Sequence, residues 1–324
     1  MIRSVLLAAV ALGLSPVAPP TLTIKEWPIP WEGRPRDPFV GPDGRVWFVG
    51  QAGNYVGVLT PASGDLKQFA LPDGAGPHNL IVGADGMIWY AGNRDAHVGV
   101  LDPRSGAVTK IQTPEGVRDP HTLVWDGPGD IWFTAQQSNY VGHIDTESRA
   151  VRVAQVPTPR SRPYGIVMGP DRHPWIVLFG TNKLATVDPA TFALREIELP
   201  RAEARPRRLV VTPDGMVWYG DYAKGMLGRY DPKTGAFREW ALPSGERSLP
   251  YAMALDDRNR IWLVETGVRP NQFVGFDPAS ETFVATAAIP SGAGSVRHMV
   301  FDPKTRSFWF GTDVNTIGRA TLAD

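Results

Sequence analysis

The chain of 324 residues contains no cysteine, so no disulfide framework can stabilise it. Its 33 basic and 33 acidic side chains cancel, and it therefore lacks the basic excess that nucleic-acid binders use. Long helices are also disfavoured, because 34 Gly and 31 Pro suit many tight turns between short strands. Stability has to come from a packed core, and we expect no nucleic acid among the partners.

Long apolar runs are absent except at the N-terminus, where Arg3 precedes the stretch 5–14. A positive charge followed by a short apolar run is typical of a signal peptide. The run is too short to cross a bilayer as a helix. We therefore expect residues 1–20 to be a signal peptide, the protein to be exported to the periplasm or secreted, and no membrane span to be present.

Familiar catalytic motifs are absent too. The sequence has no G-x-S-x-G elbow, no H-E-x-x-H pair and no P-loop. Serine hydrolase, zincin and nucleoside-triphosphatase activities therefore have no support in the sequence.

What the chain does contain is a repeat of 42 to 47 residues, and each copy carries a tryptophan within a short apolar run. The seven tryptophans are Trp47, Trp89, Trp132, Trp175, Trp218, Trp262 and Trp309. A period of this length, with several short strands in each unit, is typical of a β-propeller blade. We interpret the tryptophans as packing residues between blades, because a large buried aromatic side chain stabilises by about 1.5–3 kcal/mol.

The repeats predict an all-β fold: one seven-bladed β-propeller of four-stranded blades over residues 21–324. The last repeat ends after its third strand, whereas residues 22–30 resemble the outer strand of another repeat, 236–243. We therefore expect the N-terminal strand to complete the last blade. Such closure removes an open sheet edge, so deleting this strand should destabilise the whole ring.

Function is expected where the repeats differ. The position that opens each first strand, usually just after a proline, should line one mouth of the central channel. These seven positions are Phe39, His78, His121, Tyr164, Arg207, Tyr251 and His298. Of these, we expect Phe39, Tyr164, Arg207 and Tyr251 to bind substrate, because concave sites with convergent polar groups are the usual binding pockets.

Further polar residues follow five of the tryptophans by three or four positions: Asn93, Gln136, Asp221, Glu265 and Asp313. Others, including Asp37, Asp119, Arg162 and Arg205, come just before the first strands. The channel mouth is thus expected to have a histidine-rich, an arginine-rich and a carboxylate-rich sector.

The repeat text Arg162-Pro163-Tyr164-Gly165-Ile166, followed by Gly-x-Asp, a tryptophan strand and Val-Gly-x-Ile/Leu-Asp, resembles the virginiamycin B lyase (streptogramin lyase) family over residues 26–320. The resemblance implies an elimination that opens an ester in a cyclic depsipeptide or similar substrate. A bound Mg²⁺ would polarise the substrate, and a histidine would remove a Cα proton.

The family motif is Pro-His in one blade and Glu-Pro-His, with a later Glu, in the next. In the last two blades, His298 matches the histidine base and Asp313 the later carboxylate, whereas Tyr251, Val296 and Arg297 depart from the motif. A closer copy is formed by Pro77-His78 with Asp119-Pro120-His121. There the resemblance implies His121 as general base, His78 at the leaving group, and Asp119 with Gln136 as Mg²⁺ ligands.

Two other functions stay open. A metal-dependent lactonase of the six-bladed type is disfavoured by the seven repeats. A non-catalytic periplasmic propeller could instead bind a peptide, sugar or partner protein, with Arg162, Arg205, Arg207 and Arg208 holding an anionic group. In either case we expect a monomer with a small-molecule or peptide ligand at the channel mouth.

Overall fold

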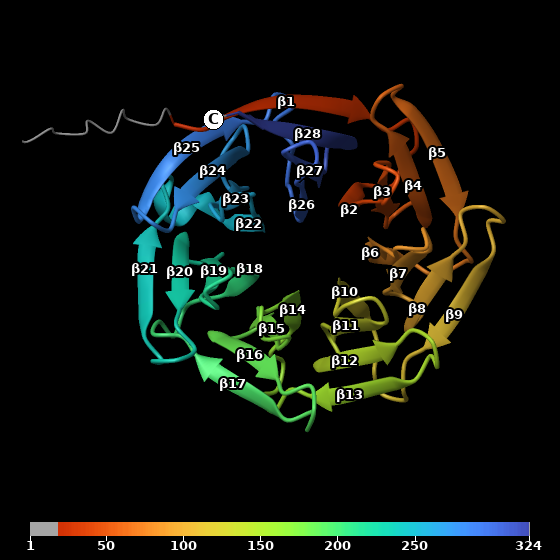
Figure 1. Ribbon diagram of the computed structural model, residues 1–324, viewed down its shortest axis with the longest axis horizontal. Coiled ribbons are helices and arrows are strands. Elements are labelled where there is room, and N and C mark those ends of the chain that lie inside the picture. The colour runs from red at the N-terminus through yellow and green to blue at the C-terminus, as the bar shows by residue number, and fades with distance from the viewer. Residues whose placement is uncertain (1–18, 324) are drawn as a thin grey trace, which may run out of the picture.

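The computed structural model describes residues 19–323, and most of the predicted signal peptide therefore lies outside the described residues. These residues form seven four-stranded antiparallel sheets arranged as blades around a central axis (Figure 1). The seven-bladed propeller predicted from the tryptophan period is confirmed. Within residues 19–323, no helix is long and apolar enough to cross a membrane.

In each blade the strands run from the channel outwards. The innermost strands are β2 (Pro35–Val40), β6 (Pro77–Val82), β10 (Pro120–Trp125), β14 (Pro163–Met168), β18 (Pro206–Val211), β22 (Pro250–Leu255) and β26 (Met299–Asp302). The second strands are β3 (Val46–Gly50), β7 (Ile88–Gly92), β11 (Asp130–Ala135), β15 (Pro174–Leu178), β19 (Val217–Asp221), β23 (Ile261–Glu265) and β27 (Ser307–Gly311).

The third strands are β4 (Tyr55–Thr60), β8 (His97–Leu101), β12 (Tyr140–Asp145), β16 (Lys183–Val187), β20 (Met226–Tyr230), β24 (Gln272–Asp277) and β28 (Thr316–Ala323). The outer strands are β5 (Asp65–Ala70), β9 (Val108–Gln112), β13 (Val151–Gln155), β17 (Leu194–Glu198), β21 (Phe237–Ala241), β25 (Thr282–Ala288) and β1 (Thr21–Pro28). A short 3-10 helix, η1 (Gly245–Ser248), precedes β22. We number the blades 1 to 7 in the order of their innermost strands.

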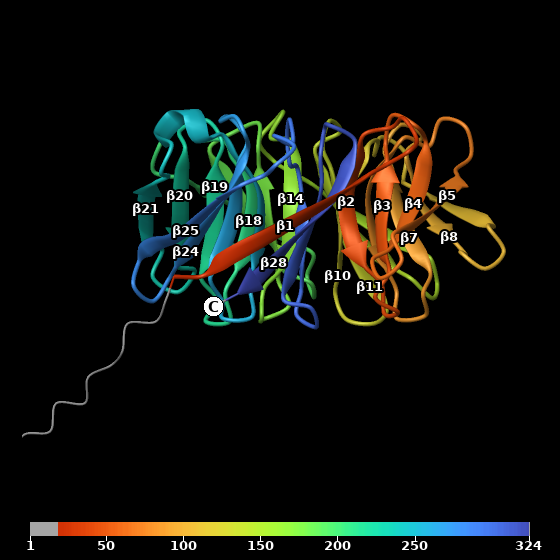
Figure 2. The ribbon, with the colours of Figure 1, turned by 90° about the horizontal axis from the view of Figure 1, so that it is seen from above.

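The ring is closed by the N-terminal strand, as predicted. Strand β1 pairs antiparallel with β28, from Thr21 opposite Ala323 to Pro28 opposite Thr316 (Figure 2). Within this seam the indole of Trp27 stacks on that of Trp309, with ring centroids 5.5 Å apart. Because the first and last segments share one sheet, no blade has to be completed by another chain.

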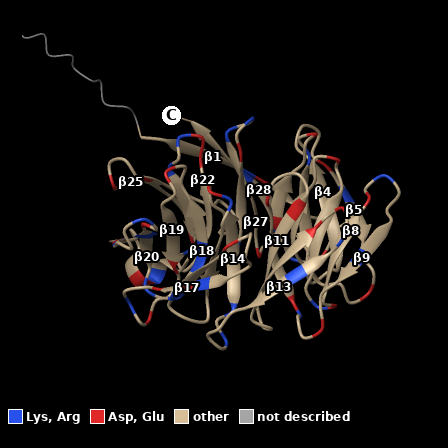
Figure 3. Cartoon of the chain, turned by 60° about the horizontal axis from the view of Figure 1, so that its bottom comes forward, with Lys and Arg blue, Asp and Glu red and all other residues tan. Residues whose placement is uncertain are grey.

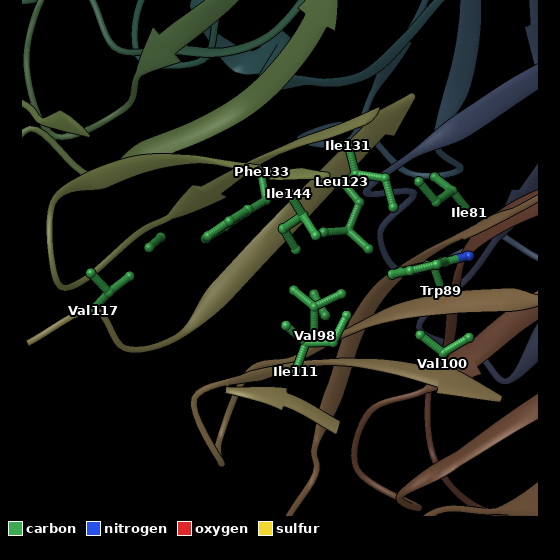
Figure 4. Close-up of a cluster of buried hydrophobic side chains, with 12 residues drawn as sticks. Ile81, Trp89, Val98, Val100, Ile111, Val117, Leu123, Ile131, Phe133 and Ile144 are labelled. Carbon is green, nitrogen blue, oxygen red and sulfur yellow. The ribbon is translucent and has the colours of Figure 1, made fainter. Parts of the chain in front are cut away.

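The repeated tryptophans are buried between neighbouring blades, and all seven are at most 8% exposed. Figure 4 shows one such cluster, in which Trp89 of blade 2 packs beside Leu123 and Ile131 of blade 3. In three blades the indole N–H also donates to the turn before the second strand, as Trp132 does to Asp126 Oδ2 at 3.2 Å. The tryptophan therefore fixes both the packing of the blade and its hairpin, which accounts for its repetition without a role in chemistry.

The Val-Gly pair of the third strand has a steric cause. A Cβ atom built on Gly142 would lie 2.1 Å from the ring of Phe133, which is paired with it on the adjacent strand. Gly99 and Tyr90 repeat this arrangement in blade 2. The glycine thus leaves room for the aromatic residue that follows the tryptophan.

Candidate functional site

All seven innermost strands begin at the same end of the channel, and strand pairing shows which residues occupy equivalent positions there. In every blade, the equivalent position lies three residues before the partner of the repeated tryptophan. We call these residues the mouth ring: Arg36, His78, His121, Tyr164, Arg207, Tyr251 and Arg297. The next residues along form the second ring: Asp37, Asn79, Thr122, Gly165, Arg208, Ala252 and His298.

Two expected positions were wrong. Phe39 pairs directly with Trp47, so it lies deeper along the channel, and Arg36 takes its place in the mouth ring. Blade 7 pairs Val300 with Trp309, which places Arg297 in the mouth ring and His298 in the second ring. The ring therefore carries three arginines rather than one.

The side chain of Arg208 reaches across the channel at the level of the second ring. From blade 5 its guanidinium reaches Asp37 Oδ2 in blade 1 at 3.5 Å, Thr122 Oγ1 in blade 3 at 3.3 Å, and the Arg297 carbonyl in blade 7 at 3.2 Å. Asp37 also accepts from Arg36 Nε at 3.1 Å and from Asn79 Nδ2 at 3.1 Å. This network, with Arg208 4% and Asp37 0% exposed, joins side chains from four blades and a backbone carbonyl from a fifth.

Arg207 is held among aromatic rings at the mouth. Its guanidinium carbon lies 3.6 Å from the ring centroid of Tyr251, 4.3 Å from that of Tyr222 and 4.6 Å from that of Phe179. Tyr251 also hydrogen-bonds through its hydroxyl to the hydroxyl of Tyr164. Such cation–π contacts hold the side chain in place without neutralising its charge.

The two tyrosines respond differently to the surrounding charge. Burial opposes ionisation of Tyr164, but Arg207, Arg208 and Arg36 together hold the pKa of its hydroxyl below the ordinary value. Burial, followed by the neighbouring Tyr164, raises the pKa of Tyr251 to about 12.

His78 and His121 are neighbours, as expected, with ring centroids 3.6 Å apart. His78 Nδ1 lies 3.0 Å from the His121 carbonyl, and His121 Nδ1 lies 2.9 Å from Thr122 Oγ1. Burial is the main cause that lowers both pKa values well below the ordinary range; nearby Arg36 and Arg208 act in the same direction. Both imidazoles are therefore neutral at pH 7, but His121 is only 1% exposed.

The residues proposed as magnesium ligands do not form a metal site. Asp119 accepts hydrogen bonds from the backbone of Gln137 at 2.5 Å and of Ser138 at 3.1 Å, and so caps its own loop. Gln136 follows β11 and is half-buried. Among residues 19–323, no group of three or more His, Asp or Glu side chains is placed to hold a metal ion. The arginine-rich mouth is also a poor donor set for Mg²⁺, which prefers charged oxygen ligands.

The carboxylates that follow the tryptophans mostly fix loops. Asp221 Oδ1 accepts from the backbone of Arg205 at 2.9 Å, and Glu265 accepts from Ser244 and Gln272. Asp313 differs, because it pairs with the mouth-ring residue Arg297 at 2.5 Å. The predicted carboxylate sector is therefore reduced to one residue at the mouth.

Two of the four arginines proposed to hold an anion have guanidinium groups that are already hydrogen-bonded within the protein. The Arg205 guanidinium donates to carbonyls of its own loop at Ala202 and Ala204, and Arg208 belongs to the buried network. Arg207 and the exposed Arg162 remain. Arg36 and Arg297 join Arg207 in the mouth ring from blades that the sequence had not indicated.

Together, these observations define a single-chain seven-bladed β-propeller whose channel mouth is lined by arginine, histidine and tyrosine. The model of the virginiamycin B lyase family matches residues 18–273. The chain belongs to this family.

Solved structures agree with that assignment. A streptogramin B lyase structure superimposes with a TM-score of 0.83 at 25% identity, covering 93% of this chain and 98% of that one. The virginiamycin B lyase from Staphylococcus aureus gives a TM-score of 0.84 at 21% identity, covering 93% and 100%. Hydrazine synthase from Kuenenia stuttgartiensis shares the fold at a TM-score of 0.73 and 15% identity, covering 90% and 96%. Comparison with curated protein sequences gives no match.

Proposed function

We propose that the mouth ring binds a small molecule or peptide through a carboxylate or similar anionic group. The observation that carries this proposal is the charge at the mouth. Four guanidinium groups, of Arg36, Arg207, Arg208 and Arg297, are paired there with only two carboxylates, of Asp37 and Asp313, which leaves an excess of positive charge. Figure 3 shows basic and acidic residues distributed around the whole ring, so the local excess is not a property of the surface at large.

Two guanidinium nitrogens support the same function. Arg36 Nη2 and Arg207 Nε are buried and have no hydrogen-bond partner among the described residues. Leaving a charged donor unpaired costs free energy, which an anion in the mouth would offset. The depressed pKa of the Tyr164 hydroxyl reports the same positive potential.

Binding is favoured over proton abstraction by the burial of the histidines. A general base has to lie within hydrogen-bond reach of the proton that it removes. His78 and His121 are only 6% and 1% exposed, whereas Arg207 and Arg297 of the same ring are half-buried and more accessible. A ligand arriving at the mouth would therefore meet guanidinium groups first.

The test compares benzoate with its uncharged analogue benzamide. We expect benzoate to raise the melting temperature of the full chain and benzamide to have no effect, since only the charged ligand pairs with the arginines. Because a hydrogen bond to a charged group contributes about 1.5–3 kcal/mol, Arg207→Gln should weaken benzoate binding about 10- to 100-fold.

Arg172→Gln is the matched control, because Arg172 pairs with Asp126 away from the mouth. It should leave benzoate affinity unchanged. Equal responses to benzoate and benzamide, or equal losses in the two arginine variants, would contradict the proposal.

A second candidate is elimination of the family type, which family membership and the neutral histidine pair favour. A base would take the Cα proton, the released electron pair would form the C=C bond, and the ester C–O bond would break. The arginines would stabilise the negative charge on oxygen. Incubating the protein with a streptogramin B, with and without EDTA, and analysing the antibiotic by chromatography tests this. Product that also forms in EDTA would establish a lyase that needs no metal ion. Antibiotic that stays intact would exclude this activity and leave binding as the proposed function.

A further inference from the structure

The opposite end of the channel has a different chemistry. There the innermost strands end around a cavity of about 590 Å³ that all seven blades line. Its wall includes five apolar residues that are only half-buried and are each paired with a repeated tryptophan: Phe39, Val124, Val167, Ala254 and Val300. Apolar side chains gathered in a concave surface of this size mark a binding site more often than a structural feature.

One of the polar side chains that line this cavity has a nitrogen atom without a hydrogen-bond partner. Asn79 and Thr122 reach the cavity, but their side chains already bond to Asp37 and Arg208. His298 also lines it, and its Nδ1 atom is buried without a hydrogen-bond partner among the described residues. Burial, followed by Arg208, lowers the pKa of His298 to about 4, so the imidazole is uncharged at neutral pH.

Among the described residues that line the cavity, none brings an unpaired charge to its rim. The acidic rim residues Asp256 and Asp257 pair with Arg260 and Arg306, each at 2.6 Å. An ionic ligand would therefore lose its hydration there without gaining an opposite charge, which is costly.

The cavity is also separate from the mouth ring. The buried Arg208–Asp37 network lies between them, and none of the seven mouth-ring residues lines the cavity. The channel thus consists of a cationic end and an apolar end, divided by a network of buried polar side chains.

We propose that this apolar cavity is a second binding site, for a small uncharged molecule that is mainly apolar and carries one hydrogen-bonding group directed at His298. The apolar part displaces water from the wall, which is the main source of affinity. The polar group selects among apolar molecules, because it meets an imidazole that has no internal partner. The site does not depend on the anion-binding function proposed for the mouth ring.

The test uses N-phenyl-1-naphthylamine, an uncharged fluorescent probe with one N–H group and a quantum yield that rises in apolar surroundings. We expect a saturable increase in fluorescence with one site per full-length chain. Ala254→Phe and Val167→Trp fill the cavity from two blades, and either should lower probe affinity more than 10-fold. His298→Leu removes the acceptor and should lower it about 3- to 10-fold.

Arg297→Gln in the mouth ring is the control and should leave probe affinity within 2-fold of the wild type. Each variant is first checked for a wild-type circular dichroism spectrum and cooperative melting. Absence of saturable binding, or unchanged binding in a folded cavity-filling variant, would overturn the proposal. Loss of probe binding in Arg297→Gln would place the probe at the mouth and would equally overturn it.

Discussion

Replacing Asp37 by asparagine tests whether the buried network stabilises the ring. Asp37 Oδ1 lies 3.1 Å from Arg36 Nε, and Oδ2 lies 3.5 Å from Arg208 Nη2. Asp37→Asn keeps the shape of the side chain but leaves two buried guanidinium groups without their carboxylate. Removing one partner of a buried ion pair costs about 3–5 kcal/mol. We expect a loss of about 3 kcal/mol, because the contact with Arg208 is long and the amide oxygen of asparagine can still accept a hydrogen bond.

A loss of about 3 kcal/mol corresponds to a fall in melting temperature of roughly 5 °C, because the unfolding entropy is about 2.1 cal/mol/K per residue over a domain of about 300 residues. Thermal unfolding followed by circular dichroism at pH 7 measures it. Asp73→Asn is the control, because Asp73 is exposed and lies in the loop after β5. If Asp37→Asn melts within about 2 °C of both the control and the wild type, the carboxylate does not stabilise the ring and the argument from burial fails.

The same substitution has a defined pH dependence. Burial opposes ionisation of Asp37, but Arg36, His298 and Arg208 hold the pKa of its carboxyl well below the ordinary value. The contribution of this carboxylate to the free energy of unfolding is therefore complete above its pKa in the unfolded state, about 4. It is lost as the pH falls toward the pKa in the folded state. The stability gap between wild type and Asp37→Asn should narrow between pH 5 and 2. A gap that stays constant or widens in acid would contradict this origin.

Two further predictions concern the scaffold. Deleting residues 21–28 removes β1 and exposes the edge of β28, so we expect cooperative thermal unfolding to be lost or shifted down by more than 10 °C, as monitored by circular dichroism. Gly142→Ala places a methyl group against the ring of Phe133 and should cost about 1–3 kcal/mol in urea unfolding. Gly129→Ala, where a Cβ meets nothing within 4 Å, should change stability by less than about 0.5 kcal/mol.

The architecture could be predicted because it depends on spacing. Each blade has to bury its own tryptophan against the next, so Trp89 or Trp132 recurs in step with the strands. The closure by β1 could be predicted for the same reason, since residues 22–30 supplied the outer strand that the last repeat lacked. Both features are properties of single segments, and a local pattern is enough to show them.

The mouth ring was only partly predictable, because position within a strand is set by pairing and not by the nearest proline. Blade 1 has prolines at Pro35 and Pro38, and counting from the second led to Phe39 instead of Arg36. Blade 7 has no proline directly before its innermost strand. Its histidine was therefore matched to those of blades 2 and 3, which led to His298 instead of Arg297. Alignment on the tryptophan would have found Arg36, which precedes Trp47 by the same interval that separates His78 from Trp89. It would not have found Arg297, because the hairpin between Val300 and Trp309 is one residue longer than in the other blades.

The residues predicted as magnesium ligands show a second limit of local patterns. A carboxylate in the right place along the chain can still point elsewhere, and Asp119, whose φ is 54°, directs its oxygens into its own loop. Conversely, Arg208 and Asp37 are 171 residues apart and meet only because the ring brings blades 5 and 1 to one axis. No local pattern indicates a contact of that kind.

A double-mutant cycle separates the network from its individual members. If Arg208 acts through Asp37, Arg208→Met and Asp37→Asn should be less destabilising together than the sum of the single changes, with a coupling of about 1–2 kcal/mol in urea unfolding. Asp37→Asn combined with Arg172→Met is the control, because Arg172 pairs with Asp126 in another part of the molecule, and these two changes should add within about 0.5 kcal/mol. Additivity in both cycles would mean that Arg208 only fills the channel, and that the apolar and cationic ends are divided by volume rather than by charge.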